Sequence, residues 1–265
     1  MKKHLIIGKP INHSLSPKIH NYWFKENNIK AIYEKSSPEE NELEEILRKV
    51  KTGEIYGMNI TVPYKQSIIP FLEDQSDAAK ETNSVNTVMN KNGKIYGDNT
   101  DIFGFQNSII KKEIKIENKT ALILGAGGVV PSIISALNNL KIGKIFLSNR
   151  TFKKAETIKK KFKDIQILEW GKVEDCDIFI NSTSVGLKKD EKIEFNYSNL
   201  SENKVFYDVI YNPSQTNFLK EAQKLGHKTI NGRDMFLYQA QKAFLLWYNI
   251  LPKINKKLLD YLDND

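Results

Sequence analysis

The chain has 265 residues, of which 40% are hydrophobic and 27% charged. This length suffices for two domains with buried cores, and the composition excludes global disorder. No apolar run is long enough to cross a membrane, and Lys9-Pro10 interrupts the opening residues too early for a secretory signal. We therefore expect a cytoplasmic protein with no membrane partner.

Lysine supplies nearly all of the positive charge behind the net charge of +8. Only Arg48, Arg150 and Arg233 are arginines. Surfaces that read bases or phosphates favour arginine in a concentrated patch, so we expect a solvated lysine surface and no nucleic-acid partner. The single cysteine, Cys176, excludes an internal disulfide, and the four histidines are not spaced as ligands, so no metal is predicted.

Short apolar runs alternate with amphipathic stretches along the chain, which is typical of βαβ units around mostly parallel sheets. Ser16-Pro17 and Ser37-Pro38 each supply an N-cap followed by proline, so each predicts a helix start. Asn92-Gly93 predicts a hairpin turn. The strands expected in this part are 2–8, 30–36, 55–61, 85–89 and 94–98, and the helices are 16–27, 37–50, 64–72 and 74–82.

A second domain is expected to follow the amphipathic helix that runs from Asp101 to about residue 112. It opens with a fully buried type of strand at 119–125. The last segment, 233–249, carries many large apolar side chains and is expected to pack on the first domain. The other strands expected here are 143–148, 164–168, 177–181, 204–210 and 228–230, and the helices are 129–140, 152–163 and 215–225.

A glycine-rich turn, Gly125-Ala126-Gly127-Gly128, directly follows the strand at 119–125 and precedes a helix. Glycines there let backbone N–H groups approach a pyrophosphate, and the helix N-terminus adds partial positive charge. The turn predicts a dinucleotide site, although Val130 stands where the fingerprint has glycine or alanine. An ordinary tight turn between a strand and a helix would carry similar residues.

The end of the next strand indicates which dinucleotide is bound. An NAD site has an Asp or Glu there for the ribose 2′-hydroxyl, whereas this chain reads Asn149-Arg150-Thr151. A guanidinium can hold a 2′-phosphate through charge-assisted hydrogen bonds, and a carboxylate would repel it. The pattern favours NADP, with Lys154 as a second cation one helical turn further on.

Polar residues at two other strand ends are candidates for substrate binding. Ser14 and Ser16 stand at the mouth of a helix, where they can hold a carboxylate or act as one cap and one loop serine. Asn59 and Thr61 leave one strand on the same side, and Lys65 follows within a turn. A lysine at the carboxyl end of a parallel strand lies where open α/β sheets bind ligands, which suits acid-base chemistry, although most lysines are surface residues.

Two more polar clusters, Asn86-Thr87 and Asn99-Thr100-Asp101, also sit at strand ends. Turn and cap chemistry explains such clusters without any ligand, and Asp101 can simply cap the helix that begins there.

The ordered set of these motifs resembles the shikimate dehydrogenases of aromatic amino acid biosynthesis over nearly the whole chain. One or two such strings would match by chance, but not the whole set. The strings are Ser14 and Ser16; Asn59, Thr61, Pro63 and Lys65; Val85-Asn86-Thr87; Gly97, Asn99, Thr100 and Asp101; Gly125 to Gly128; Asn149-Arg150-Thr151; Asn181 to Ser184 with Gly186 and Leu187; Asp208, Tyr211 and Pro213; and Gly232, Met235 and Gln239.

The resemblance implies an oxidoreductase that uses NADP(H) to interconvert 3-dehydroshikimate and shikimate, as a monomer or homodimer. It implies an α/β fold of two domains. Residues 1–101 plus 235–265 would form an N-terminal αβα substrate domain with a mostly parallel sheet, and residues 102–234 a Rossmann NADP-binding domain.

The resemblance also implies roles for individual residues. Lys65 and Asp101 would be the catalytic pair, because an ammonium stabilises the negative charge that develops on the former carbonyl oxygen and a carboxylate orients that ammonium. The implied substrate-binding residues are Ser14, Ser16, Asn59, Thr61, Lys65, Asn86, Asp101, Tyr211 and Gln239. The implied cofactor-binding residues are Gly125, Ala126, Gly127, Gly128, Asn149, Arg150, Thr151, Lys154, Thr183, Ser184, Val209, Gly232 and Met235.

Two departures from the family pattern concern the cofactor. Asp234 replaces a usual glycine, and Val130-Pro131 replaces a small residue followed by a basic one. Two alternative functions stay open. A quinate/shikimate dehydrogenase with relaxed cofactor use is disfavoured by Arg150, and a non-catalytic NADP or shikimate sensor is disfavoured because it would need neither Lys65 nor Asp101.

Overall fold

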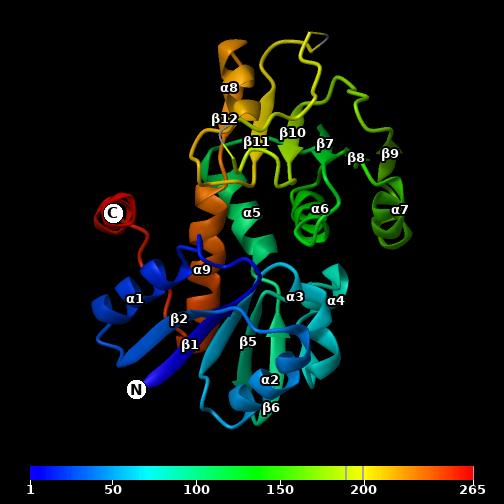
Figure 1. Cartoon of the computed structure of the whole chain (residues 1–265). Coiled ribbons are helices and arrows are strands. Elements are labelled where there is room, and N and C mark those ends of the chain that lie inside the picture. Colours follow the sequence, from blue (N-terminus) through cyan, green and yellow to red (C-terminus); the bar gives the residue numbers. More distant parts are fainter. Residues whose placement is uncertain (189, 199, 265) are drawn as a thin grey trace. The chain divides into compact units, whose positions relative to one another are not determined.

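The computed structural model describes residues 1–188, 190–198 and 200–264. The chain forms two compact units, and each contains a six-stranded sheet (Figure 1). Unit 1 comprises Met1–Gly104 and Leu237–Asp265, and unit 2 comprises Phe105–Phe236. The predicted α/β class with two mostly parallel sheets is confirmed. The units change over after residues 104 and 236, where the sequence placed the boundaries after 101 and 234.

The sheet of unit 1 has the strand order β2-β1-β3-β5-β6-β4, in which β5 runs antiparallel to both neighbours. Asn92 and Gly93 both have positive φ, which confirms the predicted hairpin between β5 and β6. The elements are β1 (Lys2–Ile7), α1 (Ser16–Glu26), β2 (Ala31–Ser36), η1 (Glu40–Glu42), α2 (Leu43–Lys51), β3 (Gly57–Ile60), α3 (Tyr64–Ser67), η2 (Ile69–Phe71), β4 (Asp74–Gln75), α4 (Asp77–Thr82), β5 (Thr87–Lys91) and β6 (Lys94–Asp98).

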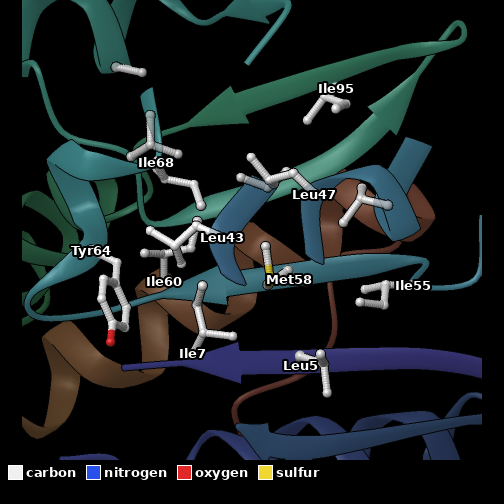
Figure 2. Packing of buried hydrophobic residues seen from close by; sticks show 14 residues of the cluster. Leu5, Ile7, Leu43, Leu47, Ile55, Met58, Ile60, Tyr64, Ile68 and Ile95 are labelled. Carbon is white, nitrogen blue, oxygen red and sulfur yellow. The ribbon is translucent and has the colours of Figure 1, made fainter. Parts of the chain in front are cut away.

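Helix α2 covers one face of this sheet. Its buried residues Leu43, Leu47 and Val50 follow helical spacing, so they form one apolar stripe. Figure 2 shows Leu43 and Leu47 packed with Met58 of β3 and Ile7 of β1. Burial of each such side chain contributes about 1.5–3 kcal/mol to folding. This packing holds the carboxyl end of β3, where the candidate residues Asn59 and Thr61 lie.

The C-terminal part of α9 (Arg233–Tyr248) packs on unit 1, to which Leu237 and the following residues belong. The indole nitrogen of Trp247 donates to the carbonyl of Val88 at 3.3 Å. A Cβ at Gly57 would lie 2.6 Å from the Trp247 ring, so only glycine fits beneath the indole. One more helix, α10 (Lys256–Asp263), follows, which the sequence did not predict; Asn255 caps it by accepting from the N–H of Leu258 at 3.0 Å.

Two predicted helix starts are wrong by local chemistry. Ser16 is the first residue of α1 and not its cap, and Leu15 at the cap position makes no side-chain bond. Ser37 does not cap either, since its hydroxyl donates to the carbonyl of Gly8 at 3.1 Å. Glu39 caps η1 instead, in a reciprocal capping box with Glu42 that satisfies two backbone N–H groups.

The helix predicted from residue 74 begins only at Asp77. The N–H groups of Glu73 and Ser76 donate to carbonyls of the β6 strand at 2.9 Å, so the chain between them forms the short strand β4. Ser76 then caps α4, accepting from the N–H of Ala79 at 3.1 Å. The predicted helix at 64–72 is likewise divided between α3 and η2.

The sheet of unit 2 has the order β12-β11-β10-β7-β8-β9, with all neighbours parallel. This is the doubly wound dinucleotide-binding order, in which ligands bind at the carboxyl ends of the strands near the switch between β7 and β10. The elements are α5 (Asp101–Lys111, which begins in unit 1), β7 (Thr120–Leu124), α6 (Val130–Asn139), β8 (Lys144–Ser148), α7 (Phe152–Lys161), β9 (Gln166–Leu168), β10 (Ile178–Asn181), β11 (Val205–Asp208), α8 (Asn217–Lys224) and β12 (Lys228–Ile230).

Within the described part of the chain, no helix has both the length and the apolar character needed to cross a membrane.

Candidate functional site

The central feature of unit 1 is an ion pair between Lys65 and Asp101. Lys65 lies on α3, one turn after β3, and Asp101 is the first residue of α5. The ammonium of Lys65 donates to Oδ2 of Asp101, and the two side chains are only 12% and 8% exposed. An ammonium has three donors, so a carboxylate that takes one leaves others for a ligand.

Asn86 fixes the second oxygen of the Asp101 carboxylate. Its Nδ2 donates to Oδ1 of Asp101 at 2.9 Å, while its Oδ1 accepts from the N–H of Thr100 at 2.8 Å. Both oxygens of Asp101 thus accept from side chains, and the residue is the first of α5 and not the cap before it that the sequence allowed. The pair and its amide partner form a rigid polar cluster made from the ends of β3, β5 and β6.

Asn59 continues this cluster toward α1. Its Nδ2 donates to the carbonyl of Asn86 and to the hydroxyl of Thr87, each at 3.0 Å. Its Oδ1 accepts from the hydroxyl of Tyr33 at 2.7 Å. Burial raises the pKa of Tyr33 well above its ordinary value, with a hydrogen bond to the Ser16 side chain opposing the shift, so this phenol stays a donor.

Tyr33 was missed by the sequence reasoning. It lies on β2 and is fully buried, and a tyrosine in a strand has no motif that separates it from an ordinary core residue. Only the side chains that surround its hydroxyl reveal the connection.

The two serines also lie at this side of unit 1. Ser14 and Ser16 are 8% and 5% exposed, and Oγ of Ser14 accepts from the N–H of Ser16 at 3.3 Å. Ser16 caps no helix, and its side chain instead forms a hydrogen bond with that of Tyr33. The carbonyl of Thr61 accepts from the N–H of Tyr64 at 3.0 Å and begins the turn that carries Lys65. Gln239 lies half-buried on α9.

In unit 2 the glycine-rich turn is closely packed at Gly125 and open at Gly128. Gly125 has a φ of +108°, which other residues rarely adopt, and a Cβ there would lie 2.7 Å from Oγ of Ser182. On the other side of the turn, a Cβ at Gly128 would meet no atom within 4 Å. The exposed Gly127 and half-buried Ala126 complete the turn, and α6 starts behind it with Pro131 in its first turn. This open backbone in front of a helix N-terminus fits a pyrophosphate.

The residues after β8 supply positive charge beside the turn. Asn149 Nδ2 donates to the carbonyl of Thr151 at 2.8 Å, which closes the loop. Arg150 and Lys154 are exposed, and in the described part of the chain neither forms an ion pair. Because β8 is the parallel neighbour of β7, both carboxyl ends lie at the same edge of the sheet. Two uncompensated cations there fit the 2′-phosphate of NADP.

The remaining candidates of unit 2 lie in the loops after β10, β11 and β12 and at the start of α9. Thr183 and Ser184 follow β10, and Val209 follows β11. A Cβ at Gly232 would lie 2.0 Å from the carbonyl oxygen of Val209, so these two backbones are in contact. Buried Met235 lies in the first turns of α9. Tyr211 also belongs to unit 2, and its ring stacks on that of Phe236 with centroids 4.9 Å apart.

The two departures from the family pattern are accommodated locally. The carboxylate of Asp234 pairs with the ammonium of Lys112, with Nζ and Oδ2 3.1 Å apart. Asp234 is therefore neutralised by a cation of its own unit. Val130 and Pro131 are buried in the first turn of α6, which forms as predicted.

No group of three or more His, Cys, Asp or Glu side chains gathers as a metal site among residues 1–188, 190–198 and 200–264. Cys176 is buried, and burial raises the pKa of its thiol to about 11, which keeps it protonated and unreactive.

Comparisons with known proteins match both units. A family model described as the shikimate dehydrogenase substrate binding domain matches residues 6–88, and one described as shikimate / quinate 5-dehydrogenase matches residues 108–223. The shikimate dehydrogenase (NADP(+)) of Pelagibacter ubique (strain HTCC1062) is 52% identical to this chain over 262 residues, which cover 99% of each chain.

Solved structures agree with this match. A crystal structure of shikimate dehydrogenase from Aquifex aeolicus has a TM-score of 0.91 and 34% identity, and the alignment covers 100% of this chain and 98% of that one. The shikimate 5-dehydrogenase of Thermus thermophilus, solved in complex with NADP(H) and shikimate, has a TM-score of 0.90 and 28% identity, with 99% of both chains covered. The similarity therefore extends over the whole length of the sequence.

Proposed function

This chain belongs to the shikimate dehydrogenase family, and on that basis we infer that it catalyses the reversible, NADPH-dependent reduction of 3-dehydroshikimate to shikimate in aromatic amino acid biosynthesis. The cofactor is NADP(H), which supplies the hydride when bound. The chain's own residues have to bind both molecules, orient them and place a proton on the reduced oxygen.

We propose that unit 1 binds the substrate. Ser14 and Ser16 would take the carboxylate with their hydroxyls, and Asn59, Thr61, Asn86 and Gln239 would take the ring hydroxyls. The buried, mutually bonded arrangement of Asn59 and Asn86 supports this, because their amides are oriented before any ligand arrives. Tyr211 of unit 2 is assigned to the substrate by resemblance alone.

The acid-base step is assigned to Lys65 and Asp101. When the C3 ketone is reduced, negative charge develops on its oxygen, and the Nζ ammonium of Lys65 would donate a hydrogen bond there and supply the proton. Asp101 would hold the ammonium in place through its Oδ2 while Asn86 holds its Oδ1. The proposal depends on the observation that the buried Lys65–Asp101 ion pair is fixed by a hydrogen bond from Asn86.

We propose that unit 2 binds NADP(H) with two sets of residues. Backbone N–H groups of Gly125 to Gly128 would hold the pyrophosphate, and Asn149, Arg150, Thr151 and Lys154 the 2′-phosphate of the adenosine. Thr183, Ser184, Val209, Gly232 and Met235 would flank the nicotinamide. The unpaired Arg150 and Lys154 support the choice of NADP over NAD.

The test follows the absorbance of NADPH and NADH separately with 3-dehydroshikimate and with 3-dehydroquinate. We expect NADPH with 3-dehydroshikimate to be used in strong preference to the other pairs. The Lys65→Ala variant should lose about 10²–10⁴-fold in kcat with little change in substrate affinity, because its main interaction is made in the transition state. Lys25→Ala, at an exposed lysine of α1, is the matched control and should keep wild-type turnover. Undiminished kcat in Lys65→Ala would refute the assignment.

We also propose that the enzyme works in the cytoplasm, since a single buried cysteine gives the fold no need of an oxidising compartment.

A further inference from the structure

Asp208 is a buried carboxylate that the catalytic scheme does not use. It ends β11 and is 0% exposed. No ion pair of the described residues includes it, and burial raises the pKa of its carboxyl group. Its charge is compensated by three neutral donors: Nδ2 of Asn181 at 3.0 Å, Oγ1 of Thr216 at 2.6 Å and the N–H of Ile210 at 3.0 Å.

These donors belong to different elements of unit 2. Asn181 ends β10, the strand next to β11, and Thr216 is the N-cap of α8. A carboxylate accepts only, so one anion between two strand ends and a helix start can hold all three at once. A buried charge is costly unless it is hydrogen-bonded, so the carboxylate and its three donors depend on one another for their positions.

Asn181 connects Asp208 to the turn formed by Ser182, Thr183 and Ser184 through hydrogen bonds of its side chain. Because Nδ2 of Asn181 is committed to Asp208, its Oδ1 must face the other way, where it accepts from the N–H of Thr183 at 2.9 Å and from its hydroxyl at 2.7 Å. An amide has one donor and one acceptor end, so the carboxylate sets its orientation.

The turn at 182–184 in turn packs on the glycine-rich turn. Both the N–H and the hydroxyl of Ser182 donate to the carbonyl of Leu124, at 2.8 Å and 2.7 Å. A Cβ at Gly125 would lie 2.7 Å from Oγ of Ser182, so the two turns touch without free space. A shift of the 182–184 turn would therefore move the backbone assigned to the pyrophosphate.

We propose that Asp208 is a positioning residue for the cofactor, which through Asn181 holds the 182–184 turn against the glycine-rich turn. This inference rests on the assignment of NADP(H) binding to unit 2. Asp208 touches neither cofactor nor substrate in this scheme, and its effect is on the geometry of the turns that do.

The test is NADP⁺ binding to the full-length Asp208→Asn variant, measured by titration calorimetry without substrate. The asparagine side chain has nearly the same shape as aspartate, but its NH₂ group is a donor and would face donors of Asn181, Thr216 or Ile210. We expect the Kd for NADP⁺ to rise at least about tenfold, with the KM for shikimate unchanged. Amide hydrogen exchange at 182–187 should accelerate in the same variant without cofactor.

Asp175→Asn is the matched control, because it also removes a carboxylate of unit 2 that bonds to Lys204 and Ser201. It is expected to lower stability without changing the Kd for NADP⁺. Asn181→Ala tests whether Asp208 acts through Asn181. If it does, the double variant with Asp208→Asn and Asn181→Ala binds NADP⁺ no more weakly than Asn181→Ala alone.

Two substitutions of Thr216 test the same inference if the Asp208→Asn variant folds poorly. Thr216→Val removes one donor from the carboxylate and should weaken NADP⁺ binding, whereas Thr216→Ser keeps the hydroxyl and should not. Unchanged NADP⁺ affinity in both Asp208→Asn and Thr216→Val, or multiplicative effects in the double variant, would overturn the inference. Failure of the wild type to bind NADP⁺ would instead overturn the proposed function.

Discussion

Lys65 is one of 37 lysines, and its surroundings alone distinguish it from the rest. Most lysine side chains of this protein are exposed, whereas that of Lys65 is 12% exposed and bound to a carboxylate that is itself bound to an amide. A single residue type at a strand end is a weak signal, but a shielded ammonium with a locked counter-ion is a specific chemical device.

Arg150 is the residue that we propose to bind the 2′-phosphate of NADP(H). Replacing it by alanine should weaken NADPH binding about 10- to 100-fold, because one or two charge-assisted hydrogen bonds to the 2′-phosphate are lost. NADH, which lacks that phosphate, should bind the variant as it binds the wild type. The KM values for both cofactors measure this directly.

Arg48→Ala is the control for Arg150→Ala, since Arg48 lies on α2 in unit 1. It should leave both KM values unchanged. Equal losses for NADPH and NADH in Arg150→Ala would show that Arg150 binds some part common to both cofactors.

At the scale of elements, the sheet of unit 2 places glycines of two different kinds. Gly232 is required by packing, because a Cβ there would lie 2.0 Å from the carbonyl of Val209. Gly128 has free space around it, so nothing in the protein forbids a larger residue. The first kind serves the fold, and the second is consistent with the proposed approach of the cofactor's pyrophosphate to the backbone.

Alanine at position 232 should therefore affect stability, and alanine at position 128 should affect cofactor binding. Gly232→Ala should lower the stability of the cofactor-free protein by about 1–3 kcal/mol, the usual cost of overpacking, as measured by urea unfolding. Gly128→Ala should unfold like the wild type and yet bind NADP⁺ more weakly. Wild-type NADP⁺ affinity in Gly128→Ala would contradict the placement of the pyrophosphate at this turn.

At the scale of the whole molecule, burial shifts the pKa of histidines in unit 1 and of a carboxyl group in unit 2. Unit 1 buries His4 and His20 among aromatic rings, with His20 stacked on Tyr33 at 4.6 Å. Burial lowers the pKa of His4 to about 3 and that of His20 well below its ordinary value. Unit 2 buries Asp208, whose pKa is raised. Acid should therefore affect the stability of the two units differently.

The direction follows from proton uptake. Below about pH 6.5 the unfolded chain protonates both histidines, while folded unit 1 keeps them neutral, so each costs about 1.4 kcal/mol of stability per pH unit down to its folded pKa. Asp208 takes up its proton more readily in the folded state, so its contribution runs the other way. We expect unit 1 to lose more stability than unit 2 on acidification from about pH 7.5 to about pH 5.

Tryptophan fluorescence can follow unit 1 alone in a Trp170→Phe background, since Trp23 and Trp247 are the other tryptophans. In that background His20→Phe should make the pH dependence of urea unfolding less steep, because the phenyl ring takes up no proton while His4 still contributes. His13→Gln, at an exposed histidine, should leave the pH dependence as it is. An identical slope in His20→Phe and His13→Gln would contradict the account.

Much of the secondary structure of this protein can be predicted from local sequence, because turns, caps and apolar periodicity depend on residues that are close in the chain. The hairpin at Asn92-Gly93, the strand–turn–helix at 119–140 and the α/β class were expected and are present, and so are most strands and helices, with β4 and α10 as exceptions. Other errors lie at helix starts, where a competing partner takes the capping side chain, as the carbonyl of Gly8 does with Ser37.

The residue patterns indicated Lys65, Asn86 and Asp101 only as separate candidates, and it was the family resemblance that paired Lys65 with Asp101. The ammonium and its carboxylate stand 36 residues apart, and whether they meet depends on the strand order of the sheet. The same holds for Tyr33 and Asp208, whose partners lie on other strands and helices. Hydrogen-bond partners and burial are properties of chain segments brought together in space, so these contacts emerge only once the sheets are assembled.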